Sequence, residues 1–514
     1  MASSLTSFST RATAQTDKSD PRQVLNAAGG YTFQVSDADR LHRFLTIGTD
    51  GGTYYASEKT AVQEAGEFIV RDLLRRGTAV VDQILEVSTS GRAASNTPAL
   101  FALALAASTE SLDVRSHALE VMPRVARTAS HLFEFLTFLQ QHRGWGRQVR
   151  SAVSDWYLGK DVEALGYQVA KYRNRSGWTH RDVLHKAHTY SPGEHAGILR
   201  WIKTGKVKEA VPRAVSDLIA LRAPGAVAAD VIAAEGSQVS HEMLTEAQMV
   251  DPTAWSALLD ADRLPITALI RQLPRLTRMG LLSGPYLDLV TSRLTDKDRL
   301  IRGRVHPVSV LQALVTYKKS PDAVTAVVDA LDEAFYLSFH SLPATNVRTL
   351  HAVDVSGSMH WSAAGTVLDA CQAATALVMA AKHSNPKDMV VGFSHELVDL
   401  DISPRRRMDD VLADLDRIPF GRTDCAAPMR YALERGLDVD VFVVYTDNET
   451  YVGDIHPHQA LREYREKTGI NAKLIVAAMT GTAYTIADPT DPGMLDISGF
   501  DAAVPAIISE FSGK

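Results

Sequence analysis

A short loop with three oxygen-bearing side chains at alternate positions is the stretch best suited to chemistry in this sequence. It reads Asp354-Val355-Ser356-Gly357-Ser358 and follows the mostly apolar run 350–353. Hard divalent cations such as Mg²⁺ prefer oxygen ligands and usually keep several waters alongside them. The spacing therefore indicates a metal-binding loop at the end of a buried strand.

Two further positions are candidates to complete this metal site. Asp447 follows the apolar, β-branched run 441–446, and Thr423 lies in a loop just before a helix. In an open α/β sheet, ligands bind at the carboxyl ends of the strands, where Asp354 and Asp447 would meet. One coordination position would remain open for an outside carboxylate or phosphate. The predicted ligands are Asp354, Ser356, Ser358, Thr423 and Asp447.

Other interpretations of the same loop compete with the metal site. Asp354 and the two serines could simply form a turn and cap the following helix. A nucleophilic serine is disfavoured, because neither serine lies in a Gly-x-Ser-x-Gly elbow and no motif places a histidine as base. A metal-dependent nuclease is also disfavoured, because a two-metal site needs more carboxylates than Asp354 and Asp447 supply. We therefore expect a binding site and not an enzyme.

The elements that would position this loop alternate between strands and helices after Pro343. Strands are expected at 349–354, 388–393, 439–446 and 472–479, with 397–402 as a possible partner of the second strand. Helices are expected at 365–382, 408–416, 426–434, 457–468 and 501–511. This alternation predicts a doubly wound, Rossmann-like α/β domain over residues 345–514.

The longer N-terminal part has an almost wholly helical pattern from Asp37 to about Leu342. Helices are expected at 54–76, 98–107, 117–126, 130–142, 145–158, 163–173, 179–188, 194–204, 209–220, 226–234, 241–249, 255–260, 266–279, 284–294, 308–318 and 321–339. Such a succession, without a clear strand signal, predicts stacked helix pairs in units of roughly 25–45 residues. A single irregular all-α domain is the alternative, and a length of about 300 residues makes one compact core unfavourable.

Composition sets the remaining bounds on the chain. It has 514 residues, a net charge of −6 and two cysteines, Cys371 and Cys425, which excludes a disulfide framework and suits a reducing compartment. The start of the chain is rich in Ser and Thr and lacks a signal-peptide core, and the apolar run 99–107 is too short to span a bilayer. We expect a cytoplasmic protein with a disordered tail (1–24), a helical part (25–344) and the α/β domain (345–514).

Positive charge is concentrated in two stretches of the helical part. Residues 143–186 hold nine Lys or Arg against four acids, and residues 263–304 hold nine against three. The first stretch also contains Trp145, Trp156, Tyr157, Tyr172 and Trp178. Basic residues interleaved with aromatic ones suit single-stranded nucleic acid, because phosphates take the charge and bases stack on the rings. On composition alone, solvated helix faces and core aromatics are the favoured interpretation.

Longer motifs connect both parts of the chain to known families. The pattern Asp-x-Ser-x-Ser, then Thr, then Asp resembles the metal-ion-dependent adhesion site of the von Willebrand factor A (vWA) domain, and all five positions are matched. Segments 51–55, 143–147, 171–182 and 304–307 resemble the TROVE module of the Ro autoantigen family, and 446–450 and 456–465 resemble the same family. The resemblance covers nearly the whole chain after residue 25 and points to a bacterial-type member.

The resemblance implies a ring of HEAT-like helical repeats that carries a vWA domain. It implies binding of small noncoding Y RNA on the outer basic face, and threading of single-stranded 3′ ends of misfolded RNA through the central hole. The Y RNA-binding positions of the family correspond to Lys171, Arg175 and His188, although His188 alone would be an ordinary helix-end histidine. A monomer that works beside a 3′-to-5′ exoribonuclease is also implied, with Mg²⁺ as the cation.

Two functions of different classes follow from these observations. The leading one is a non-catalytic RNA-binding protein of RNA quality control and stress survival. The alternative is a metal-dependent adhesion or scaffold protein whose helical part is a protein-binding solenoid. Salt-dependent binding to RNA with a single-stranded 3′ tail would distinguish them, because phosphate contacts weaken as salt rises.

Overall fold

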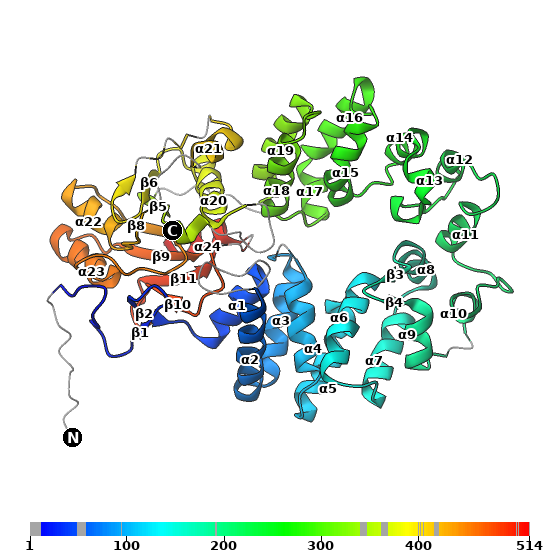
Figure 1. Ribbon diagram of the computed structural model, residues 1–514, viewed down its shortest axis with the longest axis horizontal. Helices are drawn as coiled ribbons and strands as arrows, with labels where there is room; N and C mark the ends of the chain where they lie inside the picture. Colours follow the sequence, from blue (N-terminus) through cyan, green and yellow to red (C-terminus); the bar gives the residue numbers. More distant parts are fainter. Residues whose placement is uncertain are drawn as a thin grey trace.

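The computed structural model describes residues 12–48, 58–93, 95–190, 193–339, 347–360, 368–398, 400, 402–403, 406–415, 421–499, 501 and 503–512. These residues form an arc of helices followed by an α/β domain (Figure 1). The expected fold class, a helical-repeat ring and a doubly wound sheet, is confirmed. The predicted boundary at 344/345 lies outside the described residues, as does the motif 51–55.

The arc consists of short helices that begin at polar caps and end at breaks. The Ser36 side chain accepts from the Asp39 N–H at the start of the first helix, and the Asp161 side chain accepts from the Ala164 N–H at the start of the eighth. The helices are α1 (Asp37–Ile47), α2 (Glu58–Arg76), α3 (Thr78–Ser90), α4 (Thr97–Ala106), α5 (Leu112–Val125), α6 (Ala129–His142), α7 (Arg147–Leu158), α8 (Val162–Lys171), α9 (His180–Ala187), α10 (Ala196–Thr204), α11 (Arg213–Ala220), α12 (Ala228–Ala233), η1 (His241–Met243), α13 (Glu246–Met249), α14 (Pro252–Asp260), α15 (Ile266–Arg278), α16 (Gly284–Leu294), α17 (Lys297–Arg302), α18 (Pro307–Lys318) and α19 (Thr325–Leu337).

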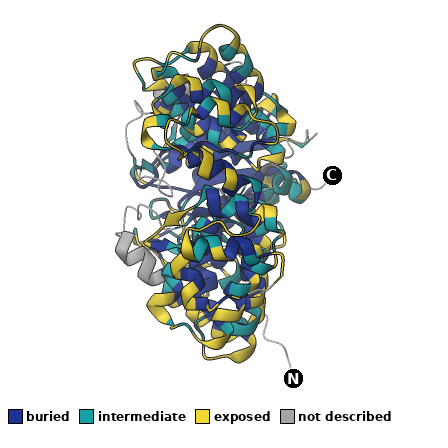
Figure 2. Ribbon diagram, turned by 90° about the vertical axis from the view of Figure 1, so that its right-hand side faces the viewer, coloured by how far each residue is buried: buried dark blue, intermediate teal, exposed yellow. Residues whose placement is uncertain are grey.

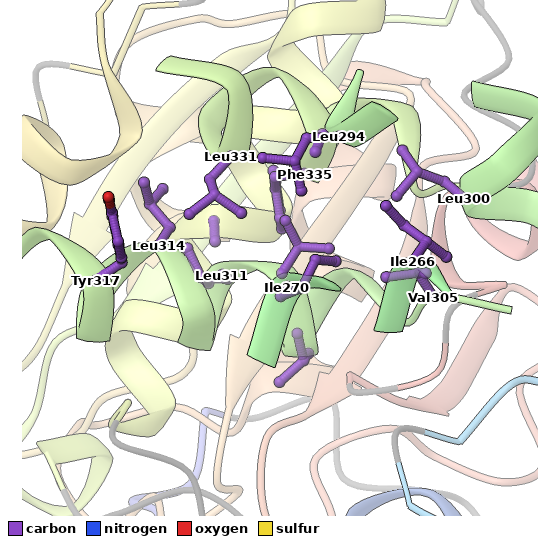
Figure 3. Packing of buried hydrophobic residues seen from close by; sticks show 14 of the residues in the cluster. Ile266, Ile270, Leu294, Leu300, Val305, Leu311, Leu314, Tyr317, Leu331 and Phe335 are labelled. Atoms are coloured by element: carbon purple, nitrogen blue, oxygen red, sulfur yellow. The ribbon is translucent and has the colours of Figure 1, made fainter. Parts of the chain in front are cut away.

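The helices stack in pairs along the arc. Helices two apart in the chain pack together, such as α3 on α5, α4 on α6 and α5 on α7, which builds two layers. Exposed residues follow the outer turns while buried ones line the helix contacts (Figure 2). Between α15, α16, α18 and α19 the core is apolar, mostly aliphatic, and includes Ile270, Leu294, Leu311, Leu331 and Phe335 (Figure 3). Burial of this kind contributes about 1.5–3 kcal/mol for each large side chain.

One short strand pair interrupts the helices, contrary to the expectation of no strand in this part. The strands β3 (Asn174–Arg175) and β4 (Trp178–Thr179) pair antiparallel between α8 and α9. Ser176 and Gly177 form the turn, both with positive φ (50° and 78°), which glycine adopts without steric cost. A two-residue turn so placed brings Arg175 next to Trp178.

Both ends of the arc meet the α/β domain and each other. Arg43, in α1, pairs with Asp496 of that domain. Tyr336, in α19, stacks its ring on that of His383, with 4.7 Å between the ring centroids. His306 accepts from the Val308 N–H at Nδ1, so its Nε2 donates to the Arg92 carbonyl at 3.1 Å. Because residue 92 precedes α4 and residue 306 precedes α18, this contact closes the arc into a ring.

The α/β domain is built on a sheet of mostly parallel strands. Its order is β11-β9-β8-β5-β6-β7, and of these six described strands only β7 runs antiparallel to its neighbour. The strands β5 and β8 are buried throughout, which is typical of central parallel strands. The elements are β5 (Thr349–Asp354), η2 (Gly357–His360), α20 (Ala370–Ser384), β6 (Met389–Phe393), β7 (Leu397–Val398), α21 (Met408–Leu415), α22 (Ala427–Glu434), β8 (Val441–Thr446), α23 (Pro457–Thr468), β9 (Lys473–Ala478), β10 (Tyr484–Thr485), β11 (Met494–Ser498) and α24 (Val504–Ser512).

The two faces of this sheet have different cores. On one face, Val443 and Tyr445 belong to the cluster that contains α20, α21 and α24 and continues into the helical arc. On the other face, Phe442 and Val444 pack with α22 and α23. The alternation of side chains along β8 thus anchors the domain to the ring on one side only.

The N-terminal segment corrects the predicted disordered tail. Residues 1–11 lie outside the described residues, but 12–24 are ordered against the α/β domain. The strands β1 (Val24–Leu25) and β2 (Tyr31–Gln34) form a hairpin, and β2 pairs with β10. Gln15 is fully buried, and its side-chain amide donates to Asp424 at 2.6 Å and to the Ile455 carbonyl at 2.9 Å. Residues 12–34 therefore belong structurally to the C-terminal domain, which shifts the predicted boundary at residue 25.

An ion-pair cluster at Asp501 ties the ring to this domain and makes its stability depend on pH. Burial alone would raise the pKa of Asp501, but hydrogen bonds from His42 (2.8 Å) and Arg92 (2.5 and 2.9 Å) lower this pKa to about 2. A carboxyl pKa depressed from about 3.9 in the unfolded chain stabilises the fold above pH 4, and this contribution is lost as pH falls toward 2.

We expect Asp501→Asn to lower the free energy of unfolding at pH 7 by about 2 kcal/mol. The gap between wild type and variant should narrow as pH falls from 4 to 2, because protonation then removes the same charge from the wild type. Urea titrations at several pH values measure this gap. A gap that stays constant across that range would contradict the assignment.

Of the described residues, no helix has both the length and the apolar character needed to cross a membrane.

Candidate functional sites

The predicted metal loop lies at the carboxyl edge of the sheet, as expected. The strands β5 and β8 are neighbours with Val353 opposite Tyr445, so Asp354 and Thr446 leave the sheet side by side. The Thr446 hydroxyl donates to Asp354 Oδ2 at 2.6 Å, and the Ser356 N–H donates to Asp354 Oδ1 at 2.9 Å. Asp354 is thereby held in one orientation at the end of its strand.

The remaining predicted ligands come from the same loop and from two neighbouring loops at this edge. The hydroxyls of Ser356 and Ser358 are 3.2 Å apart, and the Gly357 N–H donates to the Gly421 carbonyl at 3.3 Å. The latter contact places the loop that carries Thr423 against the serine loop. All five predicted ligands are at most 8% exposed: Asp354, Ser356, Ser358, Thr423 and Asp447.

Two buried carboxylates of like charge dominate the electrostatics of this site. Burial and the charge of Asp447 raise the pKa of Asp354 to about 7. Burial also raises the pKa of Asp447, against a hydrogen bond from Ser358 that lowers it. An opposite charge between them would relieve both penalties. The donor set of two carboxylates and three hydroxyls fits a hard divalent cation, with the five predicted residues as its holders.

Sequence reasoning missed two groups of this site. Glu449 is 2% exposed, and burial together with Asp447 raises its pKa to about 7. Thr446 orients Asp354 through its hydroxyl. A signal for both is present in the sequence, because they lie beside Asp447 in the motif Thr446-Asp447-Asn448-Glu449-Thr450.

The N-terminal hairpin holds the loop that carries Asp447. Asn26 donates to the Thr450 carbonyl at 2.8 Å, and the Ala28 N–H donates to Glu449 at 3.0 Å. A Cβ on Gly30 would lie 1.9 Å from the Thr450 carbonyl oxygen, so only glycine fits there. Because more than 400 residues separate the partners, no local pattern could indicate these contacts.

The three residues expected to bind Y RNA lie close in the chain but in different environments. Arg175, in β3, and His188, the C-cap of α9 with φ 55°, are exposed. Lys171, at the end of α8, has a side chain only 10% exposed, and its Nζ is 3.5 Å from Glu242. Lys171 also lies 5.4 and 5.2 Å from the ring centroids of Tyr167 and Tyr172. Arg175 and His188 are therefore accessible to a ligand, whereas Lys171 is largely engaged within the protein.

The aromatic residues of the first basic stretch are mostly core. Trp156, Tyr157 and Trp178 are buried, so stacking of these rings on RNA bases is excluded in this structure. The indole N–H of Trp156 donates to the Ala126 carbonyl at 2.6 Å. Trp145 is half-buried, and its ring centroid is 5.8 Å from that of Trp178. The interpretation favoured by composition, core aromatics, holds for the three buried rings.

Exposed basic residues nevertheless gather around the strand pair β3–β4 and helix α9. We call these residues the hairpin surface: Arg173, Arg175, Arg181, Lys186 and His188. No ion pair of these five residues with another described residue is present. Solvated positive charge of this kind is what phosphate contacts require.

Comparison with known proteins now places the molecule. Residues 24–213 and 237–320 match the TROVE domain, and residues 348–512 match the Ro60 vWA domain, so the class is a TROVE helical part joined to a vWA domain. The chain is 38% identical to RNA-binding protein RO60 of Deinococcus radiodurans, over 97% of each protein. It is 32% identical to RNA-binding protein RO60 of Caenorhabditis elegans, over 98% of this chain and 92% of that protein. The chain therefore belongs to the Ro60 family.

A solved structure supports the same conclusion. The crystal structure of the Deinococcus radiodurans RO (RSR) protein superposes with a TM-score of 0.69 at 35% identity. The match covers 93% of this chain and 99% of that one. The resemblance drawn from the sequence motifs is thus confirmed at the level of family and fold.

Proposed function

We propose that this chain is a non-catalytic, cytoplasmic RNA-binding protein that acts in RNA quality control and stress survival. The observation that carries the proposal is the hairpin surface, on a chain whose relatives are named RNA-binding proteins over nearly their full length. Small noncoding Y RNA binds the outer surface of the ring through Arg175 and His188, with Lys171 beside them. Single-stranded 3′ ends of misfolded RNA enter the hole of the ring.

The proposal includes a cation and partners. Mg²⁺ is held by the two carboxylates and three hydroxyls at the sheet edge, where it neutralises the buried pair and offers a position to an outside carboxylate or phosphate. The protein is a monomer, and a 3′-to-5′ exoribonuclease is its partner in processing RNA. Closure of the ring supports the threading step, since a closed ring admits RNA only by a free end.

The RNA contacts can be tested at the three outer positions. The triple variant Lys171→Ala, Arg175→Ala, His188→Ala should weaken binding of a structured small RNA by roughly tenfold or more. The slope of log K against log salt should fall in magnitude by about 1–2, since each lost phosphate contact removes about 0.7–0.9. Fluorescence anisotropy over 50–300 mM salt measures both quantities.

A matched control replaces an exposed cation on the other domain. Lys467→Ala on α23 removes a side chain that is 60% exposed and paired only with Glu463 among the described residues. RNA affinity should not change in this variant. If the triple variant binds as tightly as Lys467→Ala, the outer contact lies elsewhere on the molecule.

A further inference from the structure

A hollow lined by arginines lies between helix α8 and the loops that flank α15 and α17. Its volume is about 430 Å³, within the range of small-ligand sites. Tyr167 comes from α8, Arg263 and Leu264 from the loop before α15, and Arg302 and Gly303 from the end of α17. We call this hollow the arginine pocket. Its lining comes from four segments of the chain, at residues 167, 238–239, 262–266 and 299–303, so no local sequence pattern could indicate it.

Positive charge in the arginine pocket is only partly neutralised. The lining contains Arg263, Arg299 and Arg302 against one acid, Asp262. Asp262 is already engaged, since Arg299 donates to its two oxygens at 2.7 and 3.0 Å and Arg293 lies 3.4 Å away. These arginines lower the pKa of Asp262 and keep it ionised, and the hydrogen bond from Arg299 has the largest effect.

Two of the arginines have spare donors. Arg302 is exposed, and neither Arg302 nor Arg263 forms an ion pair with any residue that the structure describes. The Nε of Arg263 is buried and has no hydrogen-bond partner. Because this atom is closed to a ligand, a bound anion would be held by the terminal guanidinium nitrogens of Arg263 and Arg302.

The start of α15 adds a second attraction for an anion. This helix has 13 residues, begins at Ile266 directly after Pro265, and has no side-chain cap, while Pro265 and Ile266 both line the pocket. Uncapped N–H groups at a helix start, together with the helix dipole, favour negative charge. Gly303 lets the end of α17 pack closely on the start of α15, because a Cβ there would lie 2.4 Å from the Ile266 side chain.

The rest of the wall is apolar and aromatic. Val239, Leu264 and Ile266 are buried, and half-buried Tyr167, whose ring centroid lies 5.4 Å from Lys171 Nζ, also lines the pocket. A ligand with an anionic group and a flat apolar body would satisfy both sides. We infer that the arginine pocket binds a nucleotide, with its phosphate on Arg263, Arg302 and the start of α15 and its base against Tyr167 and the aliphatic wall.

This inference goes beyond the RNA contacts proposed above, because it needs neither Arg175 nor His188. The nucleotide has two possible sources: a free mononucleotide, or one unit of a bound RNA. Adenosine 5′-monophosphate, adenosine and inorganic phosphate probe the free form, and a single-stranded oligoadenylate probes the RNA form. Isothermal titration calorimetry at low salt measures each.

We expect nucleotide affinity to depend on the phosphate group of the ligand and on the arginines of the pocket. Adenosine should bind at least about tenfold more weakly than its 5′-monophosphate, since charge-assisted hydrogen bonds are lost. Arg302→Gln should weaken nucleotide binding at least about tenfold, and Arg263→Gln should do the same by removing a second donor. Arg278→Gln, at the far end of α15 and outside the pocket lining, is the matched control and should bind as the wild type does.

The two sources and the failure of the idea give different results. Binding of the monophosphate that depends on Arg302 supports a free nucleotide, and Arg302-dependent binding of the oligoadenylate alone supports an RNA unit. If wild type binds none of these probes, or if Arg302→Gln and Arg278→Gln bind equally, the inference is wrong. Either failure leaves the test at Lys171, Arg175 and His188 untouched. Because Arg302 is exposed and unpaired, its replacement should leave the thermal unfolding midpoint unchanged.

Discussion

Arg43→Met should lower the free energy of unfolding by about 3–5 kcal/mol, the usual result of removing one partner from a buried ion pair. Arg43 is 1% exposed, and its Nη2 lies 2.5 Å from both carboxylate oxygens of Asp496. Its Nη1 donates to the carbonyls of Thr482 and Tyr484 at 2.7 and 2.8 Å. One side chain from α1 thus satisfies three acceptors of the C-terminal domain.

Loss of the guanidinium would remove the donor to the Thr482 and Tyr484 carbonyls and to the Asp496 carboxylate. Burial already raises the pKa of Asp496 despite Arg43, so without Arg43 this largely buried carboxylate would lack a cation and keep only its hydrogen bond from Thr485. Methionine has a similar length and replaces most of the packing, which confines the change to charge and hydrogen bonds. Urea titration followed by circular dichroism measures the free energy.

Two controls separate this effect from general damage. Arg75→Met breaks a pair with Asp37, but the Arg75 side chain is 61% exposed, so the cost should stay below about 1 kcal/mol. The double variant Arg43→Met, Asp496→Leu should recover part of the loss, because no unpaired carboxylate remains. If Arg43→Met costs no more than Arg75→Met, α1 does not depend on this pair.

Helices and central strands could be predicted because their patterns are local. Helix 284–294 was expected and is observed with the same bounds as α16, and the apolar runs before Asp354 and Asp447 are β5 and β8. Helices α1, α3 and α17 were not predicted individually, although the region was expected to be almost wholly helical; α17 is six residues long and only Leu300 in it is buried. The strands β1, β2 and β10 were missed because two-to-four-residue strands have too few positions to show an alternation. The five-residue edge strand β11 (Met494–Ser498) was missed as well.

The parts of the candidate sites that local sequence patterns encode could also be predicted, and the parts that depend on distant contacts could not. Asp354, Ser356 and Ser358 are neighbours in the chain, and Asp447 follows a strand whose partner was evident, so the sequence could bring them together. The engagement of Lys171 with Glu242 depends on how α8 meets η1, which no local pattern encodes. The order of residues 12–24 likewise arises from partners such as Asp424 and Thr450, and a polar composition conceals it.

At the metal site, one substitution should weaken the binding of Mg²⁺ and yet leave the metal-free protein at least as stable as before. Asp447→Asn should weaken binding of Mg²⁺ by more than about 100-fold, because one of two charged ligands is lost and neutral oxygens hold hard cations less strongly. The same variant, without any divalent cation, should be at least as stable as the wild type. Removing Asp447 as a charge relieves its repulsion of Asp354, which lies fully buried beside it.

The chosen replacement keeps the local hydrogen bond. Asp447 Oδ1 accepts from the Glu449 N–H at 3.0 Å, and an asparagine oxygen can accept in the same way. Asp438→Asn is the matched control, since that carboxylate is 69% exposed and pairs with Arg348 on the opposite edge of the sheet. It should change neither the affinity for Mg²⁺ nor the effect of a chelator.

Thermal unfolding with EDTA and with Mg²⁺, alongside calorimetric titration of the metal, measures both directions. Wild type should gain stability on adding Mg²⁺, because a ligand that binds only the folded state stabilises it. Asp447→Asn should gain none at the same concentration, and in EDTA it should unfold no earlier than wild type. An equal gain of stability in both proteins would mean that Mg²⁺ binds somewhere other than this edge of the sheet. A variant that unfolds earlier in EDTA would mean that Asp447 supports the loop through contacts stronger than the repulsion it removes.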